Sequence, residues 1–324
     1  MSKTLPVISV IMSTYNRKNF LPRALESILS QTFKNFELIL VNNGSTDGSN
    51  KICEEYKKKD SRIKVITVKE NLGAPIGKNA GLDAASSKYL TFVDDDDQCE
   101  PQMLEFLWDL ANEYHADISL CGSWNVFNGK KEPYFIFKEL LVLDKVQGID
   151  ELLKREKYNV APPTKLFRKS LFEEIRFKEN VIVDDIHIIY KVFSKAHRVV
   201  AHGRPLYHFT KHNNNMTSFI QTNNLSPELL NEYLSAFRER TKYLSTEVPE
   251  ITMRAKYSEW SFMLSMCYKI KKYNCTSCAK LYNVMAESIR ASYQEWLDSP
   301  FITKREKKIL PSILNLSSNL FDTT

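Results

Sequence analysis

Short apolar runs alternate with amphipathic segments along the first part of the chain. Continuous apolar runs predict buried strands, and apolar residues spaced three and four apart predict helices. The predicted strands cover 7–12, 36–41, 63–68, 89–93 and 118–121, and the predicted helices cover 20–31, 49–58, 76–85 and 101–114. Strands that alternate with helices favour right-handed crossovers and a mostly parallel sheet flanked by helices, so the pattern predicts an α/β fold.

The pattern changes in the remainder of the chain. From 125 to 157 neither period is clear, as expected for variable substrate-binding loops. A further helix is predicted over 186–193, and from Pro227 onward apolar residues recur at helical spacing. We therefore predict two domains, an α/β domain over 1–220 and a helical domain over 221–324.

The last predicted helix carries basic and apolar residues together. Lys304, Arg305, Lys307 and Lys308 precede a short apolar stretch that ends at Leu314. One interpretation is an amphipathic segment that docks on an anionic membrane surface. The other is a solvated terminal helix, and the sequence leaves both open.

Four consecutive carboxylates, Asp94 to Asp97, directly follow the apolar run Tyr89 to Val93. If the strand continued, Asp94 and Asp96 would leave one face and Asp95 and Asp97 the other. Adjacent negative charges repel one another. A bound Mg²⁺ or Mn²⁺ offsets this repulsion, because such ions bind one or two carboxylates together with substrate phosphates. A solvated acidic turn is the alternative. The position after a buried strand, where open α/β sheets bind ligands, favours a metal and phosphate site.

Composition narrows the class of protein. The 324 residues are 43% hydrophobic and 26% charged, which is typical of a globular protein with a sizeable core. A net charge of +6 suits anionic small molecules or an anionic membrane surface, and it predicts no nucleic-acid partner without a matching motif. No apolar run reaches the roughly 20 residues that span a bilayer, and the amino terminus lacks a secretory signature. We therefore expect a cytoplasmic protein.

Four segments together resemble family 2 glycosyltransferases with the GT-A fold. They are the successive stretches 7–17, 36–48, 71–81 and 89–101, which carry Tyr-Asn-Arg, Asn-Gly-Ser-Thr-Asp, Asn-x-Gly and the Asp run. The resemblance covers roughly the first two-thirds of the chain and implies a Rossmann-like sheet. It also implies a metal-dependent transferase that uses a nucleotide-sugar donor, with Mn²⁺ or Mg²⁺ as the cofactor.

The resemblance assigns the donor side to individual residues. Tyr15 should stack on the uracil of a UDP-sugar, with Ser13 and Arg17 in the same loop. Asn43 stands where the family usually has Asp to receive the uracil N3–H, and an amide offers both an acceptor and donors. Lys78 stands where the family often has Arg, near the base and phosphates; an exposed helical lysine is the alternative.

The resemblance also assigns the Asp run, in which Asp94 or Asp95 reaches the ribose. Asp96 is the principal metal ligand, assisted by Asp94. His208 and His212 could touch the diphosphate or act as an extra metal ligand, although isolated histidines are more often structural.

The acceptor side is assigned to the later part of the first domain. The stretch 162–168 looks like the family segment before the acceptor site, and Met216-Thr217-Ser218 resembles the segment that closes the site. The resemblance makes Asp185 the general base, with Asp184 replacing the usual Glu. A sugar hydroxyl is a poor nucleophile, so a carboxylate must take its proton as the anomeric carbon is attacked. The alternative is that this pair caps the helix that follows.

The resemblance therefore predicts inverting transfer of a hexose or N-acetylhexosamine from a UDP-sugar to a hydroxyl of a glycan or glycolipid. The expected setting is bacterial surface-glycan assembly at the inner face of the cell membrane, with peripheral membrane contact or homo-oligomers as further expectations. One rival is a sugar nucleotidyltransferase, which would carry a Gly-rich basic loop after the first strand, where this chain has Ser13 to Arg17. The other is a catalytically idle glycan-binding or scaffold protein, which would have lost Asp96 and Asp185.

Overall fold

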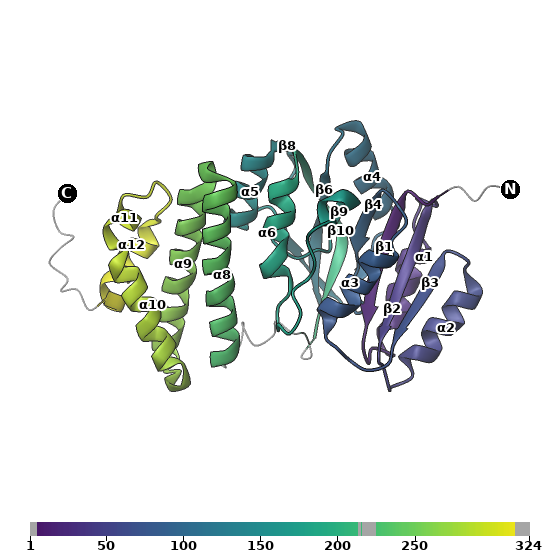
Figure 1. Ribbon diagram of the computed structural model, residues 1–324, viewed down its shortest axis with the longest axis horizontal. Coiled ribbons are helices and arrows are strands. Elements are labelled where there is room, and N and C mark those ends of the chain that lie inside the picture. The colour runs from purple at the N-terminus through teal and green to yellow at the C-terminus, as the bar shows by residue number, and fades with distance from the viewer. Residues whose placement is uncertain (1–4, 213–214, 216–224, 315–324) are drawn as a thin grey trace. The chain divides into compact units, whose positions relative to one another are not determined.

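The computed structural model describes residues 5–212, 215 and 225–314. The chain divides into two compact units, Met1–His212 and Asn213–Thr324, which we call unit 1 and unit 2 (Figure 1). The domain boundary predicted between 220 and 221 lies outside the described residues. Unit 1 holds the sheet and unit 2 is helical, so the α/β fold class with a helical carboxyl-terminal region is confirmed.

Unit 1 is built on one large sheet of strands in the order β3-β2-β1-β4-β9-β6-β10-β5, with β7 added beside β6 and β8 beside β10 (Figure 1). The strands are β1 (Ile8–Thr14), β2 (Phe36–Asn43), β3 (Ile63–Val68), β4 (Tyr89–Phe92), β5 (Gln98–Cys99), β6 (Ile118–Phe127), β7 (Lys130–Tyr134), β8 (Leu140–Asp144), β9 (Lys165–Arg168) and β10 (Arg198–Lys211). The helices are α1 (Leu21–Leu29), α2 (Ser49–Lys59), α3 (Ala74–Ala84), α4 (Met103–Glu113), α5 (Lys145–Lys154) and α6 (Asp185–Lys195).

Strand direction corrects the expectation of a mostly parallel sheet. Strands β3, β2, β1 and β4 are parallel, as the alternating pattern predicted. Beyond them β9 runs antiparallel to both β4 and β6, and β5, β7 and β8 also join by antiparallel pairing. The sheet is therefore mixed, because alternation of strands and helices constrains direction only where each strand is followed by a crossover helix.

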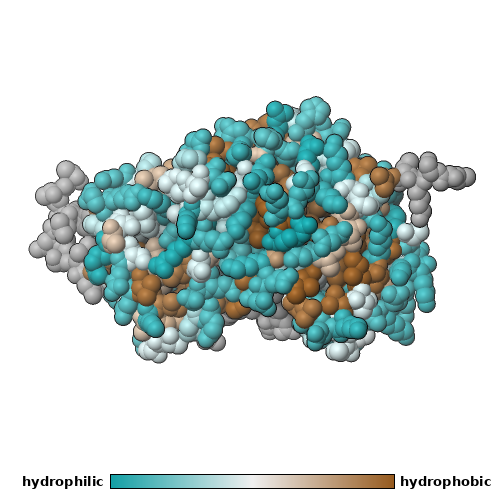
Figure 2. Space-filling view, viewed as in Figure 1, coloured by the Kyte–Doolittle hydropathy of each residue, from teal (hydrophilic) through white to brown (hydrophobic). Residues whose placement is uncertain are grey.

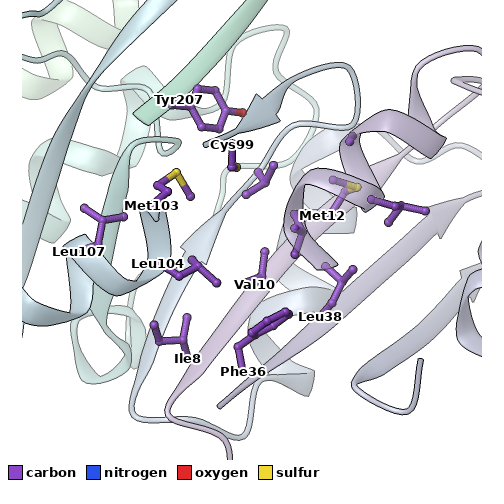
Figure 3. Close-up of a cluster of buried hydrophobic side chains, with 14 of the residues drawn as sticks. Ile8, Val10, Met12, Phe36, Leu38, Cys99, Met103, Leu104, Leu107 and Tyr207 are labelled. Atoms are coloured by element: carbon purple, nitrogen blue, oxygen red, sulfur yellow. The ribbon is translucent and has the colours of Figure 1, made fainter. Parts of the chain in front are cut away.

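The residues of β1 alternate between the two faces of the sheet. Ile8, Val10 and Met12 belong to a buried cluster with residues of α1, α2 and α4, part of which Figure 3 shows. The alternate side chains of β1 point to the other face, where α3 packs. Both faces are thus covered, which explains why the strand reads as a continuous apolar run.

Two glycines let α3 approach β1 closely. A Cβ atom on Gly77 would lie 2.0 Å from the Ser13 hydroxyl oxygen, and one on Gly81 would lie 2.4 Å from a methyl carbon of Ile11. The glycines are four residues apart and so share one face of the helix. Gly77 lies against Ser13, one residue before the end of β1, and Lys78 follows Gly77 in sequence.

The stretch 125–157 is more regular than we predicted. It contains the end of β6, strands β7 and β8 and helix α5, which begins with a capping box between Asp144 and Gln147. The expectation of irregular loops is therefore wrong for most of this stretch. Strand β7 is polar and mostly exposed, so it lacks the apolar pattern that marks a buried strand. Strand β8 is the apolar run Leu140–Leu143 followed by Asp144, which our prediction overlooked.

Unit 2 consists of helices around its own apolar core: α8 (Pro227–Glu247), α9 (Thr252–Lys272), α10 (Ala279–Ala291), α11 (Tyr293–Leu297) and α12 (Lys304–Leu314). The apolar face of α12 is part of this core, since Leu310, Ile313 and Leu314 are at most 3% exposed. The helix therefore presents only its basic face to solvent, which excludes the membrane-docking interpretation that needs the apolar face. Among the described helices, none is long and apolar enough to cross a bilayer.

Candidate functional site

The loops after β1 and β2 are tied together by hydrogen bonds. The backbone N–H groups of Asn16, Arg17 and Lys18 donate to the side chains of Ser45, Ser49 and Asp47, respectively, at 3.0–3.1 Å. In return, the Asn16 side chain accepts from the backbone of Thr46. The polar residues of the Asn-Gly-Ser-Thr-Asp segment thus fix the shape of the first loop.

This arrangement leaves Tyr15 at the surface. Its side chain is among the exposed large hydrophobic ones, at 39%, whereas Ser13 is half-buried beneath α3. Asn16 adopts φ +52°, a left-handed conformation that Asn tolerates, and the chain turns at that point. An exposed aromatic face beside the end of a parallel sheet can accept a planar base by stacking.

Asn43 connects the β2 end to the loop before α3. Its amide N–H₂ donates to the Asn71 side chain at 3.1 Å and to the Gly73 carbonyl at 2.9 Å, and its oxygen lies 3.4 Å from the Leu72 backbone nitrogen. Both amide hydrogens are therefore engaged. The oxygen keeps accepting capacity for an external N–H donor, the capacity that a carboxylate would have at this position.

The Asp run forms a turn instead of extending the strand. Strand β4 ends at Phe92, and the Asp97 backbone N–H donates to the Asp94 carbonyl at 3.2 Å. The expected alternation of the four carboxylates between two sheet faces is therefore wrong. A turn allows Asp95 and Asp96 to share a neighbour: Arg17 Nε lies 3.6 Å from Asp95 Oδ1 and 4.0 Å from Asp96 Oδ2.

Asp97 points inward and holds the turn against β10. Its carboxylate accepts from the Tyr207 hydroxyl at 2.9 Å and from the Thr210 backbone at 2.6 Å. The same hydroxyl accepts from the Asp94 backbone N–H at 3.1 Å. Sequence reasoning missed the role of Tyr207, because the two segments lie more than a hundred residues apart and meet only in the sheet.

His212 and Asp96 are neighbours at the end of β10. His212 Nε2 lies 2.9 Å from Asp96 Oδ2, and its ring stacks on Phe20 with centroids 4.8 Å apart. Arg23, which the sequence did not single out, donates to the Asp96 carbonyl at 2.9 Å and to Thr210 at 3.0 Å. His208, by contrast, lies 2.8 Å from Glu100. Met216, Thr217 and Ser218 lie outside the described residues.

Lys78 links α3 to the segment before α6. Its ammonium lies 2.8 and 3.0 Å from the two carboxylate oxygens of Asp184 and 5.1 Å from the centre of the Phe177 ring. Asn79 fixes this approach, because its amide donates to the Phe177 carbonyl and accepts from the Phe177 N–H. Lys78 is only 15% exposed, so the interpretation as an exposed helical lysine is wrong.

Asp184 occupies the position before α6 without capping it. Its side chain makes no capping hydrogen bond and is directed to Lys78 instead. Asp185 begins the helix, and its Oδ1 is buried without a hydrogen-bond partner in the described part of the chain. A buried acceptor without a donor is costly, and such atoms often mark a site that a ligand completes. The capping interpretation therefore does not account for this pair.

Burial and mutual repulsion raise the pKa values of the clustered carboxyls. Burial and the Asp96 charge raise the pKa of Asp94 to about 6 and that of Asp95 to about 7. Burial and the Asp184 charge raise the pKa of Asp185 to about 6, while Lys78 opposes the shift. Burial alone would lower the pKa of Lys78, but Asp184 and Asp94 raise it above its ordinary value. These residues interact electrostatically, so the two acidic segments share one environment.

The residues of the turn fit a cation that takes most of its ligands from a substrate. Over residues 5–212, 215 and 225–314, no three His, Cys, Asp or Glu side chains are grouped to hold a metal ion by themselves. Asp96 and His212 nevertheless present an oxygen and a nitrogen 2.9 Å apart, beside Asp94 and Asp95. Mg²⁺ and Mn²⁺ sites that bind nucleotide phosphates need only one or two such protein ligands.

The segment before β9 is held in a strained conformation. Thr164 has φ +74°, which is unfavourable for a β-branched residue. The next residue, Lys165, is completely buried and donates to the Ala161 carbonyl at 2.5 Å. Burial lowers the pKa of Lys165 to about 7, and the Asp185 charge opposes this shift. The segment assigned to the acceptor side therefore lies within electrostatic range of Asp185.

Comparison with known sequences now identifies the family. The family profile described as Glycosyl transferase family 2 matches residues 9–176, slightly more than half of the chain. The chain belongs to glycosyltransferase family 2. Glycosyltransferase GlyA of Streptococcus pneumoniae serotype 4 is 36% identical over 210 residues, which are 62% of this chain and 30% of GlyA. The chain thus aligns with less than a third of the length of GlyA.

Two solved structures share this fold. Staphylococcus aureus TarS 1–349 in complex with UDP-GlcNAc superposes with a TM-score of 0.69 at 21% identity, covering 95% of this chain and 90% of that one. The mannosyltransferase PcManGT of Pyrobaculum calidifontis, in complex with GDP-Man and Mn²⁺, gives a TM-score of 0.58 at 14% identity, covering 97% and 86%. These similarities support the GT-A fold that the family resemblance implied.

Proposed function

We propose that this family 2 glycosyltransferase moves a hexose or N-acetylhexosamine from a UDP-sugar to a hydroxyl of a glycan or glycolipid, with inversion at the anomeric carbon. The observation that carries the proposal is the meeting of two acidic segments at Lys78. Asp184 forms an ion pair with its ammonium, and Asp94 and Asp185 interact with the same charge. In a direct displacement, the donor-side carboxylates bind the nucleotide-sugar and the acceptor-side carboxylate takes the proton of the attacking hydroxyl. Both kinds of carboxylate must therefore lie in one site, as they do here.

The donor-binding side comprises the loops after β1, β2 and β4. Tyr15 stacks on the base, with Ser13 beside it. The Asn43 oxygen accepts the uracil N3–H, since both of its amide hydrogens are already engaged. The UDP-GlcNAc complex of TarS, which has the same fold, supports a nucleotide-sugar of this type. Asp94 or Asp95 binds the ribose hydroxyls, which are donors that a carboxylate accepts well.

Asp96, Asp94 and His212 would hold the cation. When bound, Mn²⁺ or Mg²⁺ offsets the negative charge that develops on the departing diphosphate. Arg17 lies within 4.0 Å of Asp96, so it adds a positive charge to the same place. Lys78 adds a second positive charge, 2.8 Å from Asp184 Oδ2.

Asp185 is the general base in this proposal. Its carboxylate takes the proton of the acceptor hydroxyl as that oxygen attacks the anomeric carbon, and the bond to the diphosphate breaks. Asp185 Oδ1 has no hydrogen-bond partner among the described residues, which supports this role because the acceptor hydroxyl can donate to it. Asp184 and Lys78 are positioning residues that fix the start of α6.

We place the reaction in the cytoplasm, at the inner face of a bacterial membrane, in the assembly of a surface polysaccharide, lipo-oligosaccharide or glycoprotein glycan. This setting rests on the family alone. Peripheral membrane contact and homo-oligomers remain part of the proposal.

A donor panel with Mn²⁺ tests the proposal directly. Release of nucleoside diphosphate is measured with and without candidate glycans for the wild type, Asp185→Asn and the control Asp109→Asn, whose carboxyl is exposed on α4. We expect Asp185→Asn to bind UDP-sugar normally and to lose transfer by roughly a hundredfold or more, whereas Asp109→Asn keeps both. Undiminished transfer by Asp185→Asn would remove it from the base role.

The same panel separates the rival functions. A nucleotidyltransferase would consume a nucleoside triphosphate and a sugar phosphate and would release pyrophosphate. An idle glycan-binding protein would bind a glycan and release no diphosphate from any donor. Either result would contradict the proposed transfer reaction.

A further inference from the structure

The turn between α9 and α10 in unit 2 carries an unusual concentration of positive charge. Between Trp260 and Ala286 the sequence has no Asp or Glu, and its charged residues are Lys269, Lys271, Lys272 and Lys280. Figure 1 shows this turn at the lower end of α9, where the chain reverses into α10. We call the stretch Tyr268–Lys280 the basic tip.

Two aromatic side chains stand among these lysines. Tyr268 is 36% exposed and Tyr273 is 42% exposed, although most large apolar side chains of the described chain are buried. The Lys272 ammonium lies 5.3 Å from the centre of the Tyr273 ring. Exposed tyrosines beside lysines are typical of surfaces at the lipid headgroup level, because the ring has an apolar body and a polar hydroxyl.

The basic tip is anchored to the core of unit 2 and to α12. Between the two helices, Cys278 is fully buried and donates to the Leu225 carbonyl at 3.5 Å, while Ile270 packs in the core of unit 2. Lys271 donates to the Ser312 carbonyl of α12 at 2.7 Å. The remaining lysines and the two tyrosines are therefore presented on a fixed support, so contact with a surface costs little ordering entropy.

One acidic side chain near the tip, Glu228, does not cancel this charge. Glu228, at the start of α8, raises the pKa of Cys278 and so lies close to the tip. Its single negative charge leaves an excess of three positive charges against the four lysines. Figure 2 shows hydrophilic residues over most of the visible surface, with hydrophobic patches between them.

We propose that the basic tip docks the protein on an anionic bilayer, with the lysines at the lipid phosphates and Tyr268 and Tyr273 in the headgroup layer. Each lysine near such a surface contributes about 1 kcal/mol, so this cluster supports reversible binding without an inserted helix. This surface takes the place of the α12 segment, whose apolar face lies in the core. The inference does not depend on the transfer reaction.

Vesicle flotation with the full chain tests the proposal. The vesicles contain phosphatidylcholine alone or phosphatidylcholine mixed with phosphatidylglycerol. The tip variant combines Lys269→Gln, Lys272→Gln and Lys280→Gln. It leaves Lys271 intact, because the Lys271 ammonium donates a hydrogen bond to the Ser312 carbonyl of α12. The matched control combines Lys304→Gln, Arg305→Gln and Lys307→Gln, which removes the same three charges from exposed positions on α12.

We expect the wild type to bind the anionic vesicles and to float poorly with neutral ones, and high salt should release it. The tip variant should lose affinity on the order of a hundredfold, since three such charges act additively, while the control stays within about threefold of the wild type. Tyr268→Ser with Tyr273→Ser should weaken the binding to anionic vesicles at low salt.

Three outcomes would overturn the proposal. They are equal binding to neutral and anionic vesicles, equal losses in the tip variant and the control, and binding to soluble polyanions without binding to vesicles. Release of nucleoside diphosphate with a water-soluble acceptor is measured in parallel. A tip variant that loses vesicle binding but still releases nucleoside diphosphate would show that docking and transfer depend on different residues. The docking proposal and the proposed transfer reaction can therefore be refuted independently.

Discussion

Tyr207→Phe tests whether the Asp turn depends on a single buried hydroxyl. The hydroxyl donates to Asp97 at 2.9 Å and accepts from the Asp94 backbone at 3.1 Å, and the residue is fully buried. Phenylalanine keeps the ring, which packs against Phe209 with centroids 4.8 Å apart, so only the two hydrogen bonds are lost. The variant therefore isolates the contribution of the hydroxyl to the turn.

The expected magnitude follows from the two partners left behind. A buried donor or acceptor without a partner costs about 1–3 kcal/mol, and here one backbone N–H and one carboxyl oxygen lose theirs. The sum is about 2–6 kcal/mol, below most of the range of about 5–15 kcal/mol that is typical of a domain, so the variant should fold. For a domain of this size each kcal/mol lowers the melting temperature by about 2–4 °C, which gives a decrease of roughly 4–24 °C.

Thermal melting and Mn²⁺ titration together form the assay. Because Asp94 and Asp96 lie on the turn, its loosening should also raise the Mn²⁺ concentration that gives half-maximal activity, measured at a temperature where the variant is folded. Tyr273→Phe, with an exposed ring in unit 2, serves as the control and should change neither quantity. An unchanged melting temperature and Mn²⁺ midpoint for Tyr207→Phe would refute the reasoning. A lower melting temperature with an unchanged Mn²⁺ midpoint would show that Tyr207 contributes to stability and not to metal binding.

Three further predictions concern the charges of the site. The value of kcat/KM should rise as the pH increases through about 6, because Asp185 must be ionised to accept a proton and burial raises its pKa to that value; a flat profile from about pH 5 to 7 would contradict this role. Lys78→Met should shift that rise to higher pH, since Lys78 lowers the pKa of Asp185, and Lys78→Arg should restore it. Asp96→Asn should abolish the increase in melting temperature that Mn²⁺ gives the wild type, as measured by scanning fluorimetry.

The sequence by itself determined the parallel half of the sheet. Strands such as β1 and β2 are covered on both faces, so they must be continuously apolar, and the helices between them show their own period. The polar segments after these strands could also be predicted, because the ends of parallel strands meet at one edge. This explains why the Asn43 loop and the Asp run were found from the pattern and the family resemblance together.

Only the tertiary structure decided which of these polar groups meet. The Lys78–Asp184 ion pair joins residues 106 positions apart, and nothing in either local sequence distinguishes it from an exposed lysine and a helix cap. The exposed strand β7, with the sequence KKEPY, has no apolar pattern to detect. The apolar side of α12 is the same in sequence whether it covers a core or a membrane. Its partner is fixed by the rest of unit 2, because burial depends on what packs against a surface as well as on the surface itself.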